Sequence, residues 1–156
     1  MTLEATKWFT ASHLASVEAA MASGGKIQVA WIPLSPASSA AWSSRWFVID
    51  TLRRFGLLGA LDDVQLVVSE LVANAVAASA AEGTAFTVCL RAEEGSLFIE
   101  VGDHVEALPA LRRPTLEHPY GWGLFLVASM SERWGVYQED DGKVIWSELS
   151  CVPRDE

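Results

Sequence analysis

The chain has 156 residues, a length that suits one domain, and 51% of them are apolar, which is enough to build a sizeable core. Its formal net charge is -9, from 20 acidic residues against 11 Lys and Arg, and no basic run offsets it. Because nucleic-acid backbones are also negative, we expect no direct nucleic-acid binding. Cys89 and Cys151 have no metal-ligand or redox spacing, so we expect plain thiols.

The N-terminus lacks the features of a signal peptide. It carries Glu4 and Glu18, and no basic start is followed by a continuous apolar stretch. No window approaches the roughly 20 apolar residues that a membrane span needs. We therefore expect a cytoplasmic protein with no membrane partner.

Hydrophobic periodicity and turn residues divide the chain into helices and strands. Gly56 ends one helical pattern, and Glu82-Gly83 ends the next. The expected elements, in chain order, are a helix at 11–22, a strand at 26–32, helices at 37–55 and 62–79, strands at 84–92 and 96–101, a helix at 121–131, and strands at 134–138 and 143–149.

Hairpins without regular alternation of strand and helix predict an α+β fold. We expect a two-layer α/β sandwich, with helices on one face of a mostly antiparallel sheet. Residues 1–25 would be an N-terminal extension with a short helix, residues 26–150 the main domain, and residues 151–156 a tail. Residues 104–120 hold three prolines and no clear period, so we expect a long surface loop.

Glu70 and Asn74 are four residues apart, so they lie on one side of the helix at 62–79, beside its apolar face. A carboxylate in this position can act as a proton acceptor. The Asn74 amide oxygen is a hard ligand suited to Mg²⁺. Taken alone, the pair is better explained as part of the polar stripe of an amphipathic helix.

Asp103 follows an apolar strand, so its carboxylate would emerge at the strand end, where it can accept a hydrogen bond from an amino group such as adenine N6. Capping the turn that leaves the strand is an equally good explanation. Gly121 and Gly123 open the last helix and can let backbone amides face a phosphate. A simple turn into a helix explains these glycines equally well.

Three segments in order carry a family resemblance. SELVANAV at 69–76 resembles an N box, VGD at 101–103 with Pro109 resembles a G1 box, and GWGLFLV at 121–127 resembles a G2 box. The chain therefore resembles the GHKL (Bergerat) ATP-binding fold, and most closely the anti-sigma-factor serine/threonine kinases. The segment around Arg45 and the strands after residue 133 resemble that group as well.

The resemblance implies ATP and Mg²⁺ as cofactors. It makes Glu70 the general base for a serine hydroxyl, Asn74 the Mg²⁺ ligand and Asp103 the residue that selects adenine, while the loop 104–120 becomes a lid over ATP. The implied partners are a sigma factor and a STAS-type antagonist, and a homodimer is possible. The cofactor-binding residues would be Asn74, Asp103, Gly121, Gly123 and Leu124.

Three departures from the family pattern motivate an alternative. Family members often carry a His shortly after the N-box Asn, where this chain has Ala77 and Ala78. Val105 replaces a small or hydroxyl residue, and Trp122 replaces a frequent Arg. The alternative is a catalytically degenerate GHKL-fold module that binds a partner without phosphotransfer. A weaker alternative is an ATPase or detached histidine-kinase domain, although the chain has no phospho-acceptor helix.

Some cations and aromatic residues have open roles. Arg112, Arg113 and Lys143 could compensate for the missing Arg, but we expect surface solvation instead. Trp42 and Trp46 share a helix face, for which core packing is the favoured explanation. Trp8 and Trp122 lie outside the core patterns and could anchor a protein partner.

Overall fold

The computed structural model describes residues 11–107, 122–139 and 141–151 of the chain. Its strands form one antiparallel sheet in the order β1-β2-β3-β5-β4, so the α+β class and the mostly antiparallel sheet are confirmed. The strands are β1 (Ile27–Leu34), β2 (Phe86–Glu93), β3 (Ser96–Asp103), β4 (Arg133–Glu139) and β5 (Gly142–Ser150).

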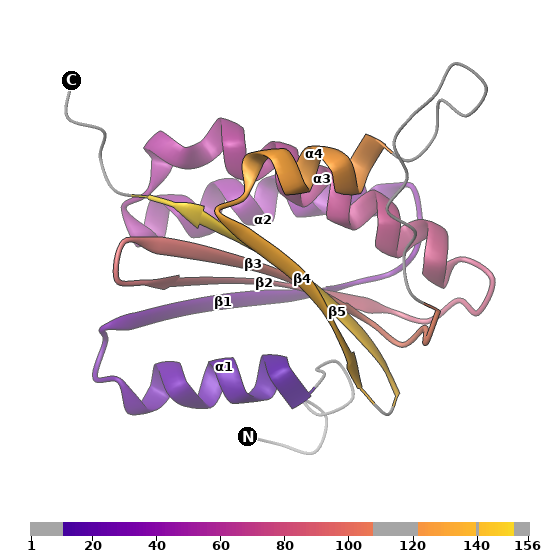
Figure 1. Cartoon of the computed structure of the whole chain (residues 1–156), viewed down its shortest axis with the longest axis horizontal. Helices are drawn as coiled ribbons and strands as arrows, with labels where there is room; N and C mark the ends of the chain where they lie inside the picture. The colour runs from indigo at the N-terminus through magenta and orange to yellow at the C-terminus, as the bar shows by residue number, and fades with distance from the viewer. Residues whose placement is uncertain (1–10, 108–121, 140, 152–156) are drawn as a thin grey trace.

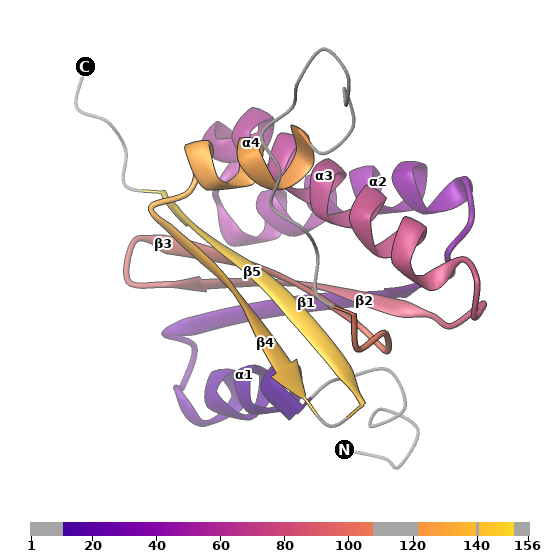
Figure 2. The same cartoon turned by 45° about the vertical axis from the view of Figure 1, so that its right-hand side comes forward.

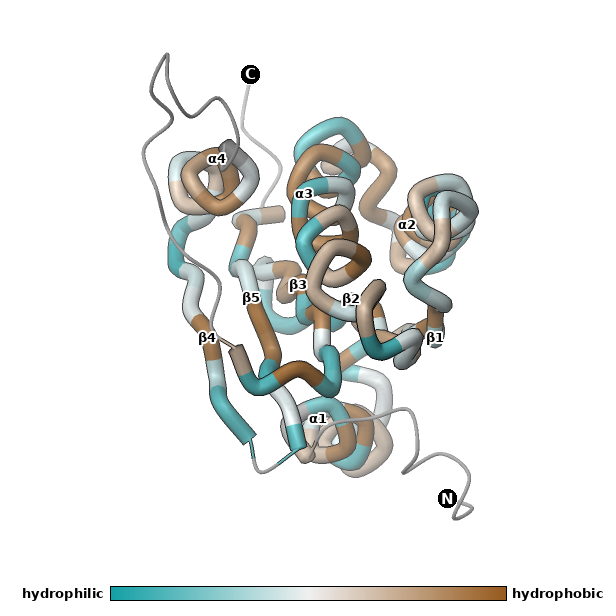
Figure 3. The backbone as a smooth tube through the Cα atoms, turned by 90° about the vertical axis from the view of Figure 1, so that its right-hand side faces the viewer, coloured by the Kyte–Doolittle hydropathy of each residue, from teal (hydrophilic) through white to brown (hydrophobic). Residues whose placement is uncertain are grey.

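Helices cover both faces of this sheet (Figure 1, Figure 3). None of the helices in the described ranges is long and apolar enough to cross a bilayer. The helices are α1 (Ala11–Ala22), α2 (Ser39–Phe55), the 3-10 turn η2 (Leu58–Ala60), α3 (Leu61–Ser79) and α4 (Trp122–Met130), and α1 is the one that lies alone on its face.

The main core lies between the sheet and the layer of α2, α3 and α4. Leu97, Ile99 and Val101 alternate along β3, are at most 2% exposed, and face this layer. The buried face of α3, which includes Val67 and Leu71, packs on them. This packing holds α3 over the centre of the sheet and fixes which of its side chains lie beside the end of β3.

The other face of the sheet is covered by α1 (Figure 2). Residues 86–90 of β2 are all buried, which shows that both faces of this strand are covered. Cys89, expected as a plain thiol, is fully buried there as a free cysteine, and burial raises its pKa. Ser16 of α1 donates a hydrogen bond to Glu100 of β3 at 3.5 Å, so the segment expected as an extension packs on the sheet.

The expected segment boundaries at residues 25 and 151 stay predictions. β1 is an edge strand of the sheet that α1 covers. His13 of α1 is fully buried, and burial lowers its pKa to about 4. Since the imidazole is then neutral at pH 7, α1 contributes no buried positive charge from His13 to this interface.

The prediction that Trp42 and Trp46 pack in the core is wrong. They are 67% and 55% exposed, with their ring centroids 6.2 Å apart in an edge-to-face arrangement on the outer side of α2. The buried side of α2 instead carries Ala40, Ser44 and Val48. Small residues at the first two positions let the helix approach the sheet closely, which a face of indole rings would prevent.

Gly142 lies where the β4–β5 hairpin meets the end of β3. A Cβ on Gly142 would overlap the backbone carbonyl oxygen of Asp103, whereas a Cβ on Gly59 would meet no atom within 4 Å. We predict that Gly142→Ala lowers the free energy of unfolding by about 1–3 kcal/mol, because the two backbones must separate. The matched change Gly59→Ala should leave it within about 1 kcal/mol. Urea denaturation of both variants checks this, and equal effects would contradict the close approach.

Candidate functional site

A cavity of about 370 Å³ lies beneath α3, at the end of the sheet where β3 stops and β5 starts. Its volume is at the lower end of the roughly 300–1,000 Å³ range of small-molecule sites. Most of its walls are apolar, with a few polar groups among them, which is the usual make-up of such a site. It is lined by Leu71, Asn74, Ala75, Ala77, Ala78, Val101, Asp103, Val105, Ala107, Lys143 and Ile145.

One row of α3 side chains runs along the cavity. Glu70, Asn74 and Ala78 are spaced by four residues, so they follow one another along the same side of the helix. Asn74 and Ala78 line the cavity, and both Glu70 and Asn74 are half-buried. Since α3 rises about 1.5 Å per residue, Glu70 lies about 6 Å closer to the N-terminus of the helix than Asn74.

Asp103 is the last residue of β3, is 2% exposed, and lines the cavity. Its Oδ1 atom accepts one hydrogen bond from the backbone N–H of Val105 and another from Lys143 Nζ, both at 2.9 Å. Both hydrogen bonds that the described residues donate to the Asp103 carboxylate are therefore accepted by Oδ1. The second carboxylate oxygen, Oδ2, keeps its capacity to accept a hydrogen bond.

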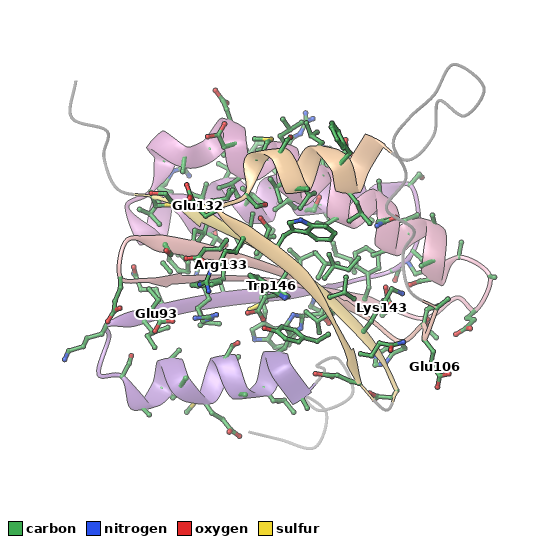
Figure 4. The ribbon with its side chains drawn as sticks, viewed as in Figure 1. Glu93, Glu106, Glu132, Arg133, Lys143 and Trp146 are labelled. Carbon is green, nitrogen blue, oxygen red and sulfur yellow. The ribbon has the colours of Figure 1, made fainter. Side chains whose placement is uncertain are left out.

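The expectation that Lys143 is solvated at the surface is wrong, because this residue is only 2% exposed. Lys143 pairs in register with Asp103 across the β3–β5 ladder, and Figure 4 shows it at the same end of the sheet as Glu106. Its ammonium forms a buried ion pair with Asp103 and also donates to the carbonyl oxygen of Val105 at 3.0 Å. The missed signal is alternation: Lys143 shares a strand face with Ile145, a core residue.

The start of α4 lies against Glu70. A Cβ on Gly123 would be 2.8 Å from Oε2 of Glu70, so glycine is needed there for the carboxylate to keep its position. Leu124, the next residue, is 5% exposed and its side chain belongs to the core. The structure thus brings Glu70 and Gly123 together, as an acid on one helix and a glycine at the start of the next.

Some predicted features fall outside the described residues. These include Gly121, the side chain of Trp122, Arg112, Arg113 and most of the expected lid. Of the residues after β3, Val105 and Ala107 are described and line the cavity. The roles of Glu70, Asn74, Asp103, Gly121, Gly123 and Leu124 in binding or catalysis stay predictions.

The antiparallel sheet thus carries α2, α3 and α4 on one face, with a largely apolar cavity under α3. Residues 36–148 match the family model of the histidine kinase-like ATPase domain. Because this match spans most of the sequence, the chain belongs to the histidine kinase-like ATPase domain family. None of the curated protein sequences matches the chain.

Solved structures support the same fold. The chain superposes on the structure of the RsbU and RsbW domains of Rv1364c from Mycobacterium tuberculosis with a TM-score of 0.59 and 19% identity, over 79% of this chain and 32% of that one. It also superposes on the SiaB-SiaC complex from Pseudomonas aeruginosa with a TM-score of 0.56 and 19% identity, over 87% of this chain and 96% of that one. At this identity the likeness establishes the fold.

The Asp103–Lys143 pair generates a prediction about stability. Lys143→Met removes the ammonium and leaves a buried carboxylate without its ion-pair partner, which costs about 3–5 kcal/mol of unfolding free energy. Lys26→Met removes the same charge from an exposed position and should cost less than about 0.5 kcal/mol.

The double variant Asp103→Asn, Lys143→Met should recover part of the loss, because no uncompensated buried charge remains. Urea denaturation of the four proteins measures these differences. A Lys143→Met variant as stable as Lys26→Met would show that the buried pair does not hold the site together.

Proposed function

We propose that the chain binds ATP with Mg²⁺ in the cavity beside Asp103 and transfers a phosphoryl group to a serine of a STAS-type antagonist protein. It would be a cytoplasmic regulator of the anti-sigma-factor kinase type, with a sigma factor as its second partner. The observation that carries the proposal is the acceptor capacity of Asp103 Oδ2 in a largely apolar cavity of about 370 Å³.

The cavity around Asp103 suits a purine ring. Leu71, Ala75, Val101 and Ile145 supply apolar walls, against which a flat aromatic ring can exchange water contacts for packing contacts. Oδ2 of Asp103 would accept a hydrogen bond from the exocyclic amino group of adenine. A buried carboxylate acceptor of this kind disfavours a base that offers no donor there, because Oδ2 would lose water without gaining a partner.

Asn74 would hold the metal. The described residues contain no group of three or more His, Cys, Asp and Glu side chains that could bind a cation by themselves. The Asn74 amide oxygen at the cavity fits Mg²⁺ that is held together with phosphate oxygens and water, a mixture that this ion commonly takes. Bound Mg²⁺ would neutralise the charge that develops on the phosphoryl group in transit.

Glu70 would act at the phosphate end of the row. The carboxylate lies next to Gly123 at the start of α4, where the helix dipole favours negative phosphate groups. During transfer the serine oxygen bonds to the γ-phosphorus, the bond from that phosphorus to ADP breaks, and Glu70 accepts the serine hydroxyl proton. Glu70 would then serve the γ-phosphate, Asn74 the metal on the phosphates and Asp103 the adenine ring, which is the order of these parts in ATP.

The partners come from the resemblance to anti-sigma-factor kinases. Two findings support a regulator that works on other proteins: one similar structure joins an RsbW domain to an RsbU domain, and the other is a complex of SiaB with SiaC. A homodimer is part of the same proposal.

A second candidate function is partner binding without phosphotransfer. The exposed pair Trp42 and Trp46 favours it, because exposed tryptophans are enriched at protein-binding hot spots. Ala78 and Val105 line the cavity at positions where the family pattern often has more polar residues. In this case the chain would bind its partners equally well whether or not Glu70 is present.

A single substitution separates the two candidates. Glu70→Gln keeps the size of the side chain but removes the proton acceptor, so we expect transfer of labelled phosphate from ATP to a purified STAS-type antagonist to fall by about 10²–10⁴-fold. Calorimetry should show that the variant still binds Mg-ATP. The control is Glu82→Gln, which makes the same charge change at an exposed position beyond the end of α3 and should transfer phosphate normally.

Two results would contradict the kinase proposal. One is saturable Mg-ATP binding with no transfer by the unmodified protein to any STAS-type antagonist that it binds, which favours the second candidate. The other is undiminished transfer by Glu70→Gln, which would remove Glu70 as the base.

A further inference from the structure

We propose that Lys143 reads the base of the nucleotide directly, by donating a hydrogen bond from its ammonium to ring atom N1 of adenine. This inference rests on the proposed function and adds a specificity-determining residue to it. It begins with two buried charged groups, Asp103 and Lys143, which line the same cavity.

The Lys143 ammonium has one N–H donor with no acceptor among the described residues. An ammonium carries three N–H donors, and the described residues accept two of them: Asp103 Oδ1 at 2.9 Å and the Val105 carbonyl oxygen at 3.0 Å. The Lys143 side chain is 3% exposed and lines the cavity, so an acceptor that enters the cavity can take the third donor.

The two fixed bonds also hold the ammonium in place. Asp103 ends β3 and Lys143 stands opposite it on β5, while Val105 belongs to the segment that leaves β3. A lysine head group is normally mobile, and two short bonds to different acceptors remove most of that freedom before a ligand arrives. The position of the ammonium is therefore set by the protein itself, at the wall of the cavity.

Together the pair presents one acceptor beside one donor. Asp103 Oδ2 would accept and the third N–H of Lys143 would donate, and the two residues are paired directly across the β3–β5 ladder. The edge of adenine that carries N6 and N1 offers the complementary order, an amino donor next to a ring acceptor. The ion pair would thus stabilise the site and also recognise adenine through two hydrogen bonds.

The test changes one atom of the ligand, so it does not depend on a variant that folds. Calorimetry on the unmodified protein compares Mg-ATP with 1-deaza-ATP, in which N1 is replaced by C–H. We expect 1-deaza-ATP to bind roughly 10–100-fold more weakly, since a hydrogen bond from a charged donor is lost. The control ligand 7-deaza-ATP keeps N1 and N6 and should bind within about 3-fold of ATP.

Lys143→Met provides the protein side of the comparison. This variant should bind ATP and 1-deaza-ATP with the same affinity, because the donor to N1 is gone, and thermal unfolding shows whether it is folded at the assay temperature. Equal binding of ATP and 1-deaza-ATP to the unmodified protein would overturn the role of Lys143 and leave the proposed function intact. No binding of ATP at all would overturn the proposed function and this inference with it, and tighter binding of GTP than of ATP would overturn the assignment to adenine.

Discussion

The buried ion pair between Asp103 and Lys143 joins the end of β3 to the start of β5, and both residues line the cavity. It fixes the position of the carboxylate, and through Val105 it also sets the direction in which the chain leaves the strand. A buried pair of this kind is costly to break, because either partner alone would be an unpaired charge out of water. The geometry of the candidate site therefore depends on this contact, and Gly142 keeps the two backbones close enough to form it.

α3 supplies the second half of the site, and its packing on the sheet determines which residues face the cavity. Its apolar face packs on β3, so Glu70, Asn74 and Ala78 follow one another along the border of that face, and Asn74 and Ala78 line the cavity. Gly123 then allows α4 to start beside Glu70. α3 thus presents an acid, an amide and apolar side chains in that order along one side of the helix. The proposed binding of a nucleotide and its metal depends on this order.

Much of the fold could be predicted from the sequence, because periodicity and turn residues are local: the helix expected at 62–79 is α3 (Leu61–Ser79), and the hairpin of β2 and β3 is where it was expected. The position of Asp103 at a strand end was predictable for the same reason. The burial of Lys143 was missed: strand alternation places it on the same face as the core residue Ile145, but the partner that stabilises its charge, Asp103, is forty residues away in the chain. Trp42 was misplaced because α2 has apolar residues on two sides, and only the close approach of Ala40 and Ser44 to the sheet decides between them. The packing of α1 on the sheet was not predicted either, because it depends on contacts with a strand distant in the chain, such as that between Ser16 and Glu100.

The central claim is that a nucleotide binds in the cavity between α3 and the ends of β3 and β5. An NMR titration of the ¹⁵N-labelled protein with Mg-ATP tests it most directly, since each backbone amide reports its own surroundings. We predict saturable shifts at the amides of Asn74, Ala78, Asp103 and Val105, with the indole N–H signals of Trp42 and Trp46 unchanged. Shifts confined to other surfaces, or none up to millimolar ATP in a folded protein, would contradict the claim.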